Sequence, residues 1–155
     1  NNLFSRLLSF YVSVKSLGEV GTEKVMIALS RNDYEPDLVF FSEEKVKTFM
    51  DDQVLFPAPD FVVEILSPST ARHDKTTKRK DYALHGIKEY WIIDPKKQNI
   101  EQYILSEENT KYGEPTLFKC GEMIESTVVT GFKIDVAAIF DEAINTKTMQ
   151  SFLKD

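Results

Sequence analysis

The sequence predicts a compact α/β fold built as a single domain over residues 1–155, and three observations favour it. The chain has 155 residues, 42% of them hydrophobic, which is enough for one domain with a buried core. Residues 3–15 place apolar side chains at helical spacing, whereas residues 61–66 form an almost continuous apolar run typical of a buried strand. A strand, a helix and another strand are then expected in succession up to residue 94. No internal repeat or linker divides the chain.

The N-terminal part is expected to contain one helix and three short strands. The helix over residues 3–15 has an apolar face made of Leu3, Phe4, Leu7, Leu8, Tyr11 and Val14. Strands are expected in three apolar runs, at residues 25–29, 38–41 and 61–66. A polar turn at residues 31–33 and a loop with Pro57 and Pro59 separate these runs, and residues 43–49 are expected to form one helical turn.

A second helix is expected over residues 75–85. Pro68 interrupts the preceding strand, Asp74 has the side chain of a good N-cap, and Gly86 is a suitable C-terminal stop. Ser67 and Thr70 are most simply turn residues whose hydroxyls satisfy loop amides.

The remaining chain is expected to be mostly β. Residues 89–94 read as a strand, and the turn at Asp94-Pro95 leads to an antiparallel neighbour at residues 100–105. Smaller strands are expected near the glycine breaks, at residues 116–119, 126–129 and 132–134. Residues 136–140 are expected to form a short helical turn.

The charge balance restricts the classes of partner. The 25 acidic and 19 basic side chains give a formal charge of −6, which opposes a role in coating or packaging nucleic acid. Any contact with nucleic acid must therefore be local. No apolar run approaches the length of about 20 residues needed to span a bilayer, and no charged leader is visible, so we expect a cytoplasmic protein. The chain starts at Asn1 rather than at a methionine, so natural N-terminal residues can be missing from it.

The residue types favour a hard metal ion over zinc. Cys120 is the single cysteine, so the chain has no internal disulfide, and His73 and His85 are its only imidazoles. Thiolate and imidazole ligands for zinc are therefore in short supply. An ion that prefers oxygen ligands, such as Mg²⁺ or Mn²⁺, suits this chain better.

Glu64 is the most informative acid because it lies inside an apolar run. Phe61, Val62, Val63, Ile65 and Leu66 surround it, and an unpaired anion in a buried strand costs several kcal/mol or more. A proton, a cationic side chain or a metal ion must neutralise it. Asp37 occupies a comparable place at the start of the apolar run 38–41, directly after Pro36.

Asp37 and Glu64 offer oxygen ligands for Mg²⁺ or Mn²⁺ if they meet at one edge of a sheet, and the backbone carbonyl of Ile65 can be a third ligand. Lys78 lies four residues after Asp74, in the helix that follows the Glu64 strand, so its ammonium can reach the carboxylates. Acids, ion and lysine together suit in-line attack of water on a phosphodiester. A structural ion-pair network around Lys78 is the simpler alternative.

These residues carry a family resemblance. The segment from residue 17 to 140 resembles the Uma-type restriction endonuclease family within the PD-(D/E)XK nuclease superfamily. The resemblance rests on Pro36-Asp37, on Val63-Glu64-Ile65-Leu66-Ser67-Pro68-Ser69-Thr70, on Asp74, Lys78 and Tyr82, and on Gly86, Glu89-Tyr90-Trp91 and Asp94-Pro95. It implies a restriction-endonuclease-like α/β core with a central mixed β-sheet flanked by helices. It also implies that Asp37 and Glu64 bind the metal and that Lys78 is the catalytic lysine.

The chain departs from the simplest superfamily pattern in two ways. Many relatives carry the lysine two residues after the glutamate, where this chain has Leu66. The lysine is expected on the helix instead, with Lys75 or Lys80 as substitutes for Lys78. The first helix offers no acid, so an additional ligand that relatives sometimes draw from it would have to come from elsewhere.

A basic stretch adjoins the predicted site. Five cations occur between residues 72 and 80, namely Arg72, Lys75, Lys78, Arg79 and Lys80. They suit a surface that follows phosphates, and a solvated helix face is the alternative. Tyr82 and Trp91 are expected in the core, and His73 is expected to be exposed beside the site.

The leading hypothesis is a Mg²⁺- or Mn²⁺-dependent endonuclease that hydrolyses DNA, working as a homodimer. Asp37 and Glu64 would hold the ion, Lys78 would assist the attacking water, and Asp74 and Tyr82 would support them. The alternative is a catalytically silent module of the same fold that binds nucleic acid or protein, linked to mobile elements or defence.

Overall fold

A computed structural model describes residues 2–23, 25–108 and 110–154. Its helical elements are α1 (Asn2–Lys15), α2 (Glu43–Val46), α3 (Ala71–His73), the π-helical segment η1 (Asp74–Lys78), α4 (Arg79–Leu84), the 3₁₀ segment η2 (Val136–Ile139) and α5 (Glu142–Ser151). Its strands are β1 (Gly18–Thr22), β2 (Met26–Ala28), β3 (Asp33–Tyr34), β4 (Leu38–Ser42), β5 (Leu55–Phe56), β6 (Phe61–Ile65), β7 (Glu89–Asp94), β8 (Asn99–Ile104), β9 (Thr116–Lys119), β10 (Met123–Glu125) and β11 (Lys133–Asp135).

The main sheet has six strands in the order β1-β4-β6-β7-β8-β9. β6 and β7 are parallel and joined through α3, η1 and α4, whereas the other neighbouring pairs are antiparallel. Two smaller sheets, β3-β2-β5 and β10-β11, accompany it. The predicted mixed sheet with helices and additional antiparallel strands is therefore confirmed.

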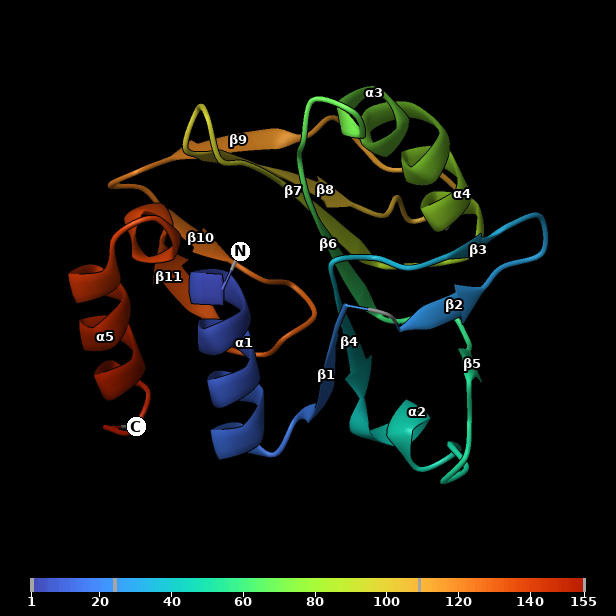
Figure 1. The fold of residues 1–155 in the computed structure, drawn as a ribbon, viewed down its shortest axis with the longest axis horizontal. Coiled ribbons are helices and arrows are strands. Elements are labelled where there is room, and N and C mark those ends of the chain that lie inside the picture. The colour runs from blue at the N-terminus through green and yellow to red at the C-terminus, as the bar shows by residue number, and fades with distance from the viewer. Residues whose placement is uncertain (1, 24, 109, 155) are drawn as a thin grey trace.

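Two apolar layers cover the two faces of this sheet. Figure 1 shows α1, α5, β10 and β11 on one side, and α3, α4 and the small sheet of β2, β3 and β5 on the other. Alternate residues of β6 serve the two layers, since Phe61 and Val63 pack with α1 while Val62 packs with Tyr82 of α4. A strand that is buried on both faces needs apolar residues at nearly every position. This explains the continuous apolar run around Glu64.

The first helix forms where its apolar pattern predicted. Phe4, Leu7 and Leu8 are fully buried, and the Phe4 ring stacks on Trp91 with ring centroids 5.7 Å apart. Burial of one such side chain stabilises a fold by about 1.5–3 kcal/mol. α1 is therefore held mainly by its packing on the sheet.

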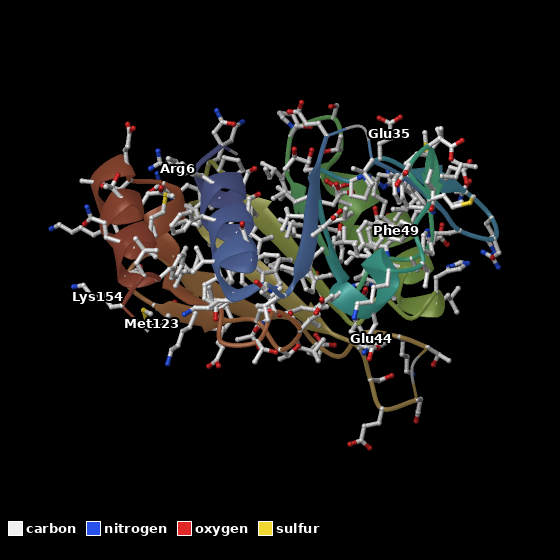
Figure 2. The ribbon with its side chains drawn as sticks, turned by 90° about the horizontal axis from the view of Figure 1, so that it is seen from below. Arg6, Glu35, Glu44, Phe49, Met123 and Lys154 are labelled. Carbon is white, nitrogen blue, oxygen red and sulfur yellow. The ribbon has the colours of Figure 1, made fainter. Side chains whose placement is uncertain are left out.

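The C-terminal helix α5, which the sequence did not predict, is fixed by one polar side chain. Asn145 is 0% exposed and donates hydrogen bonds of 2.9 Å to the carbonyls of Leu3 and Ala138. Its amide oxygen accepts a hydrogen bond of 2.9 Å from Arg6 Nε, and Arg6 projects from α1 on the side where α5 lies (Figure 2). α5 displays little amphipathic patterning, and Asn145 is its one buried residue.

Most predicted elements are confirmed within one or two residues, but two assignments are wrong. Asp74 is not an N-cap, because the helix already begins at Ala71 and Asp74 lies inside it with helical dihedral angles and 1% exposure. Residues 126–129 are not a strand, because the Ser126 hydroxyl accepts the backbone N–H groups of Val128 and Val129 and closes a turn. The strand there is β10, which pairs with β11. β1, β3 and β5 were not predicted.

In the described residues, no helix has both the length and the apolar character needed to cross a membrane.

Candidate active site

Asp37 and Glu64 meet where β4 begins and β6 ends. The antiparallel pairing of these strands sets Leu38 opposite Val63, which brings the two acids side by side. The Asp37 N–H donates to Glu64 Oε1 at 3.1 Å, and the Ile65 N–H donates to Asp37 Oδ2 at 2.7 Å. Each carboxylate is thus oriented by the backbone of the other strand.

Glu64 is buried, with 2% of its surface exposed, and its second oxygen faces the helix after β6. Lys78 Nζ lies 2.7 Å from Glu64 Oε2, and the Tyr82 hydroxyl donates to the same oxygen at 3.1 Å. Burial raises the pKa of Glu64, although the nearby Lys78 ammonium opposes this shift. Burial, followed by the charge of Glu64, also raises the pKa of Tyr82, so its phenol stays a hydrogen-bond donor.

Lys78 is held between two buried carboxylates. Its ammonium is 2.7 Å from Glu64 and 2.9 Å from Asp74 Oδ1, and the Asp74 side chain is almost fully buried. Burial alone would lower the pKa of Lys78, but the two acids outweigh it and raise this pKa, so the amine is charged. With Asp37, whose N–H donates to Glu64, the cluster contains three carboxylates and one ammonium. The site therefore has net negative charge and attracts a further cation.

The π-helical turn keeps the residues of the helix aimed at Glu64. Asp74, Lys78 and Tyr82 are spaced by four residues, and in a regular α-helix this spacing drifts by about 40° at each step. η1 spans Asp74–Lys78, and a π turn contains more residues than an α turn. The wider turn offsets part of the drift, so both Lys78 and Tyr82 reach the same carboxylate oxygen.

A polar pocket of about 200 Å³ adjoins Asp37. Asp37 and Ile65 line it together with Glu23, and Asn2 and Ser5 of α1 contribute to its wall. Carboxylate and carbonyl oxygens are suitable ligands for Mg²⁺ or Mn²⁺, so the donor set fits a hard cation at this border. No group of three or more His, Cys, Asp or Glu side chains with metal-binding geometry occurs among the described residues. Further ligands would have to be backbone oxygens, water or substrate.

Glu23 is the acid of this pocket that the sequence did not indicate. It follows β1, and its N–H donates to the Asp37 carbonyl at 3.3 Å. No motif marks it, and β1 itself was not predicted, so only the structure reveals its position.

The other basic residues of the helix point elsewhere. Lys75 pairs with Glu101 of β8 at 3.3 Å, and the Arg79 guanidinium lies over the Tyr103 ring at 5.7 Å. Lys80 and Arg72 are exposed. Of the three lysines considered, Lys78 is therefore the one placed against Glu64.

The remaining predicted residues also have defined places. Tyr82 and Trp91 are fully buried, as expected for core residues, and His73 is exposed. The Ser67 N–H donates to Thr70 Oγ1 at 3.2 Å, which confirms that these two residues close the turn after β6.

A second buried carboxylate, Glu89, lies at the start of β7 and is 0% exposed. Its oxygens accept hydrogen bonds from the Trp91 indole, the Gln102 amide, the Ser126 hydroxyl and the Thr127 N–H, at 2.6–3.1 Å. Sequence reasoning noted Glu89 as a motif residue but did not predict this network.

Comparisons with known proteins agree with the fold and with the family resemblance. The family model named Uma2, described as "Putative restriction endonuclease", matches residues 1–137. The comparison with curated proteins gives no significant match. Among solved structures, the chain is similar to one described as "a putative nuclease belonging to DUF820" from Anabaena variabilis ATCC 29413. The TM-score is 0.72 with 19% identity, covering 89% of this chain and 78% of that chain, and at this identity the likeness concerns the fold. Because the family model spans most of its length, the chain belongs to the Uma2 family of restriction-endonuclease-like proteins.

Proposed function

We propose that this protein is a Mg²⁺- or Mn²⁺-dependent endonuclease that hydrolyses phosphodiester bonds of DNA. One observation carries the proposal: the charged Lys78 ammonium lies 2.7 Å from the buried Glu64 carboxylate, beside Asp37 on the neighbouring strand. Membership of the Uma2 family supports a nuclease. The net negative charge of the cluster and the adjoining polar pocket support a divalent cation.

Each residue has a defined task in this proposal. Asp37, Glu64 and the Ile65 carbonyl would hold the ion, which when bound polarises the phosphate and lowers the pKa of a water molecule. Lys78 donates hydrogen bonds toward the attacking water and toward the negative charge that develops on the phosphate. Tyr82 fixes the orientation of Glu64, and Asp74 fixes that of Lys78. Neither of these two supporting residues needs to contact the substrate.

One observation favours a second candidate, a catalytically silent module that binds nucleic acid or protein. Glu64 already has a partner at each oxygen, because Oε1 accepts the Asp37 N–H and Oε2 accepts Lys78 and Tyr82. A carboxylate satisfied in this way can serve as a structural ion pair without a metal ion. The two candidates differ in whether metal binding needs Glu64.

Nicking of supercoiled plasmid DNA with Mg²⁺ or Mn²⁺ tests the proposal. Wild type, Glu64→Ala and Lys78→Ala should be purified identically, with Lys147→Ala on α5 as an exposed control. The proposal expects nicking by wild type and the control, and loss of nicking in the two site variants. Equal nicking by all four would identify a contaminant. Absence of nicking in all four, together with absence of Mn²⁺ binding in isothermal calorimetry, would favour the silent module.

Homodimerisation remains a prediction. Two active sites are needed to cut both strands of a duplex in one encounter, and a two-fold dimer supplies them. Exposed apolar side chains at Met50, Val54 and Leu55 are available for an interface. Sedimentation velocity at micromolar concentration will distinguish a monomer from a dimer.

A further inference from the structure

A groove of about 440 Å³ lies between the outer side of α4 and the chain that connects β8 to β9. Arg79, Lys80 and Leu84 form one wall, and Lys111, Tyr112 and Pro115 form the other. The groove shares no lining residue with the pocket beside Asp37. Its two walls come from segments about thirty residues apart in the sequence, so the sequence alone did not indicate it.

The cations of this groove differ from several other lysines of the protein. Lys45, Lys75 and Lys78 each pair with a carboxylate. By contrast, the ion pairs found among the described residues include none of Arg79, Lys80 and Lys111. Glu114 is the one acid in the lining, so the groove carries net positive charge in a protein of charge −6. Cations that line a concave surface and have no ion pair attract an anionic ligand.

Both walls hold their cations on anchored backbone. The Arg79 guanidinium rests over the Tyr103 ring, whose hydroxyl donates to Glu101 at 2.9 Å. On the other wall, the Lys111 carbonyl accepts the Ser106 N–H at 2.9 Å. The next residue, Tyr112, bridges to Leu105 and donates its hydroxyl to the Ile87 carbonyl at 2.8 Å. Little ordering is therefore needed when a ligand binds, and arginine and lysine are the usual ligands for phosphate.

We propose that this groove binds the phosphodiester backbone of a nucleic acid. Arg79 directly follows Lys78, so the groove starts one residue after the lysine that contacts Glu64. The groove and the candidate active site are thus connected through one helix, with Lys78 facing Glu64 and the groove on the outer side of α4.

This inference rests on the proposed function only in taking nucleic acid as the ligand. It also changes the set of phosphate contacts that the sequence suggested. Lys75 is excluded because it is paired with Glu101, and Arg72 does not line the groove. Lys111 is added from a segment outside the basic stretch. Cations on two facing walls suit a backbone with successive phosphates better than one small anion.

Fluorescence anisotropy with a labelled DNA duplex tests the groove directly. The double variant Lys80→Glu/Lys111→Glu should be compared with Lys133→Glu/Lys147→Glu, which makes the same change in net charge at exposed positions. Lys133 lies on β11 and Lys147 on α5, at the end of the molecule away from α4 (Figure 1). Measurements in EDTA prevent metal-dependent cleavage. Thermal unfolding of each variant verifies the fold, and Lys80→Gln/Lys111→Gln replaces the charge reversal if that variant is unstable.

The groove variant should bind DNA at least about tenfold more weakly than wild type at low salt. The slope of its log binding constant against log salt concentration should be smaller by about one to two. The control pair should stay within about twofold to threefold. Equal weakening of both pairs, or of neither, would overturn the proposal. Displacement of the duplex by millimolar inorganic phosphate would also overturn it, since it would indicate a site for free phosphate.

Failure of the groove and failure of the nuclease proposal give different results. Metal-dependent nicking combined with binding that ignores Lys80 and Lys111 would reject only the groove. Groove-dependent binding without any nicking would keep the groove and reject hydrolysis.

Discussion

Glu64 and Glu89 are two buried carboxylates on neighbouring parallel strands, and they are neutralised in opposite ways. Glu64 lies near the end of β6 and Glu89 at the start of β7, with Phe61 opposite Glu89 in the register. They also point to opposite faces of the sheet, because Glu64 meets Tyr82 whereas Glu89 meets the Trp91 indole. The two acids therefore differ in surroundings although their burial is nearly the same.

The donors that surround each acid show the difference. Glu89 accepts hydrogen bonds from uncharged groups on β7, β8 and the turn after β10, and thereby ties these segments together. Glu64 has a charged lysine beside it, and its neighbour Asp37 opens onto a pocket. Burial alone thus does not distinguish the two acids. The proposed function assigns chemistry to Glu64 because it has a cationic partner and lies beside an acid that lines a pocket.

The largest effect that separates the two acids should be on catalysis. Glu64→Gln keeps the size of the side chain but removes its charge, and we expect nicking to fall by at least about a hundredfold, as for loss of a group that acts on the transition state. Glu101→Gln, which removes the charge of the acid that contacts Lys75 and Tyr103 on β8, is the matched control. Plasmid nicking rates measure both. Unchanged nicking by Glu64→Gln would contradict a catalytic role for Glu64.

The next effect should be on stability and should fall on Glu89. Glu89→Ala leaves several buried donors without an acceptor, and we expect a loss of about 3 kcal/mol in the free energy of unfolding. For a protein of this size this corresponds to a decrease of about 6–12 °C in Tm. Urea titration and calorimetry measure it. A Tm within two degrees of wild type, within the range of about ±0.5 kcal/mol seen for surface changes, would contradict the structural role.

Stabilisation by bound metal should depend on Glu64 and not on Glu89. At a Mn²⁺ concentration of about 100 times Kd, wild type should gain about 2.7 kcal/mol of stability. Asp37→Asn and Glu64→Gln should lose this gain. Glu89→Gln should keep it, starting from a lower Tm. Differential scanning fluorimetry with and without EDTA provides the measurement, and a gain that persists in both site variants would place the ion elsewhere.

The smallest effect should appear in the pH dependence of stability. Burial raises the pKa of Glu64 above its ordinary value of 4.5. The folded state then binds more protons than the unfolded chain, so the contribution of Glu64 is most favourable below pH 4.5 and declines as pH rises through the folded pKa. Glu64→Gln should remove this decline. Urea unfolding at a series of pH values tests it, and parallel curves for the two proteins would contradict the assigned pKa direction.

The sequence predicted the central geometry because the spacing of its motifs corresponds to simple structural steps. The two apolar runs that carry Asp37 and Glu64 form adjacent strands, which brings these acids together. The four-residue spacing from Asp74 to Lys78 places both residues on one face of the helix. Asp74 was misassigned because capping preference is local, whereas its burial depends on Lys78 and on the π turn. Capping preferences consider only neighbouring residues in the sequence, so they do not include these tertiary contacts.

Long-range polar contacts escaped prediction for the same reason. The donors to Glu89 include groups up to 38 residues away, and Asn145 bonds to Leu3, which is 142 residues away. α5 has little apolar periodicity, so its sequence did not predict a helix. Val128 and Val129 suggested a strand, but their backbone N–H groups donate to the Ser126 hydroxyl and not to a neighbouring strand.

The contact between α1 and α5 has a consequence for the order of assembly during synthesis. Asn2 and Ser5 of α1 border the pocket beside Asp37, yet α1 can form its hydrogen bonds with Asn145 only after the chain has been made as far as α5. At about 5–20 residues per second, the ribosome needs on the order of ten seconds to pass from the first helix to the last. The candidate acids and Lys78 emerge well before that. A nascent chain would therefore hold these acids before α5 packs on α1, and the wall of the pocket would be fixed only after α5 has been made.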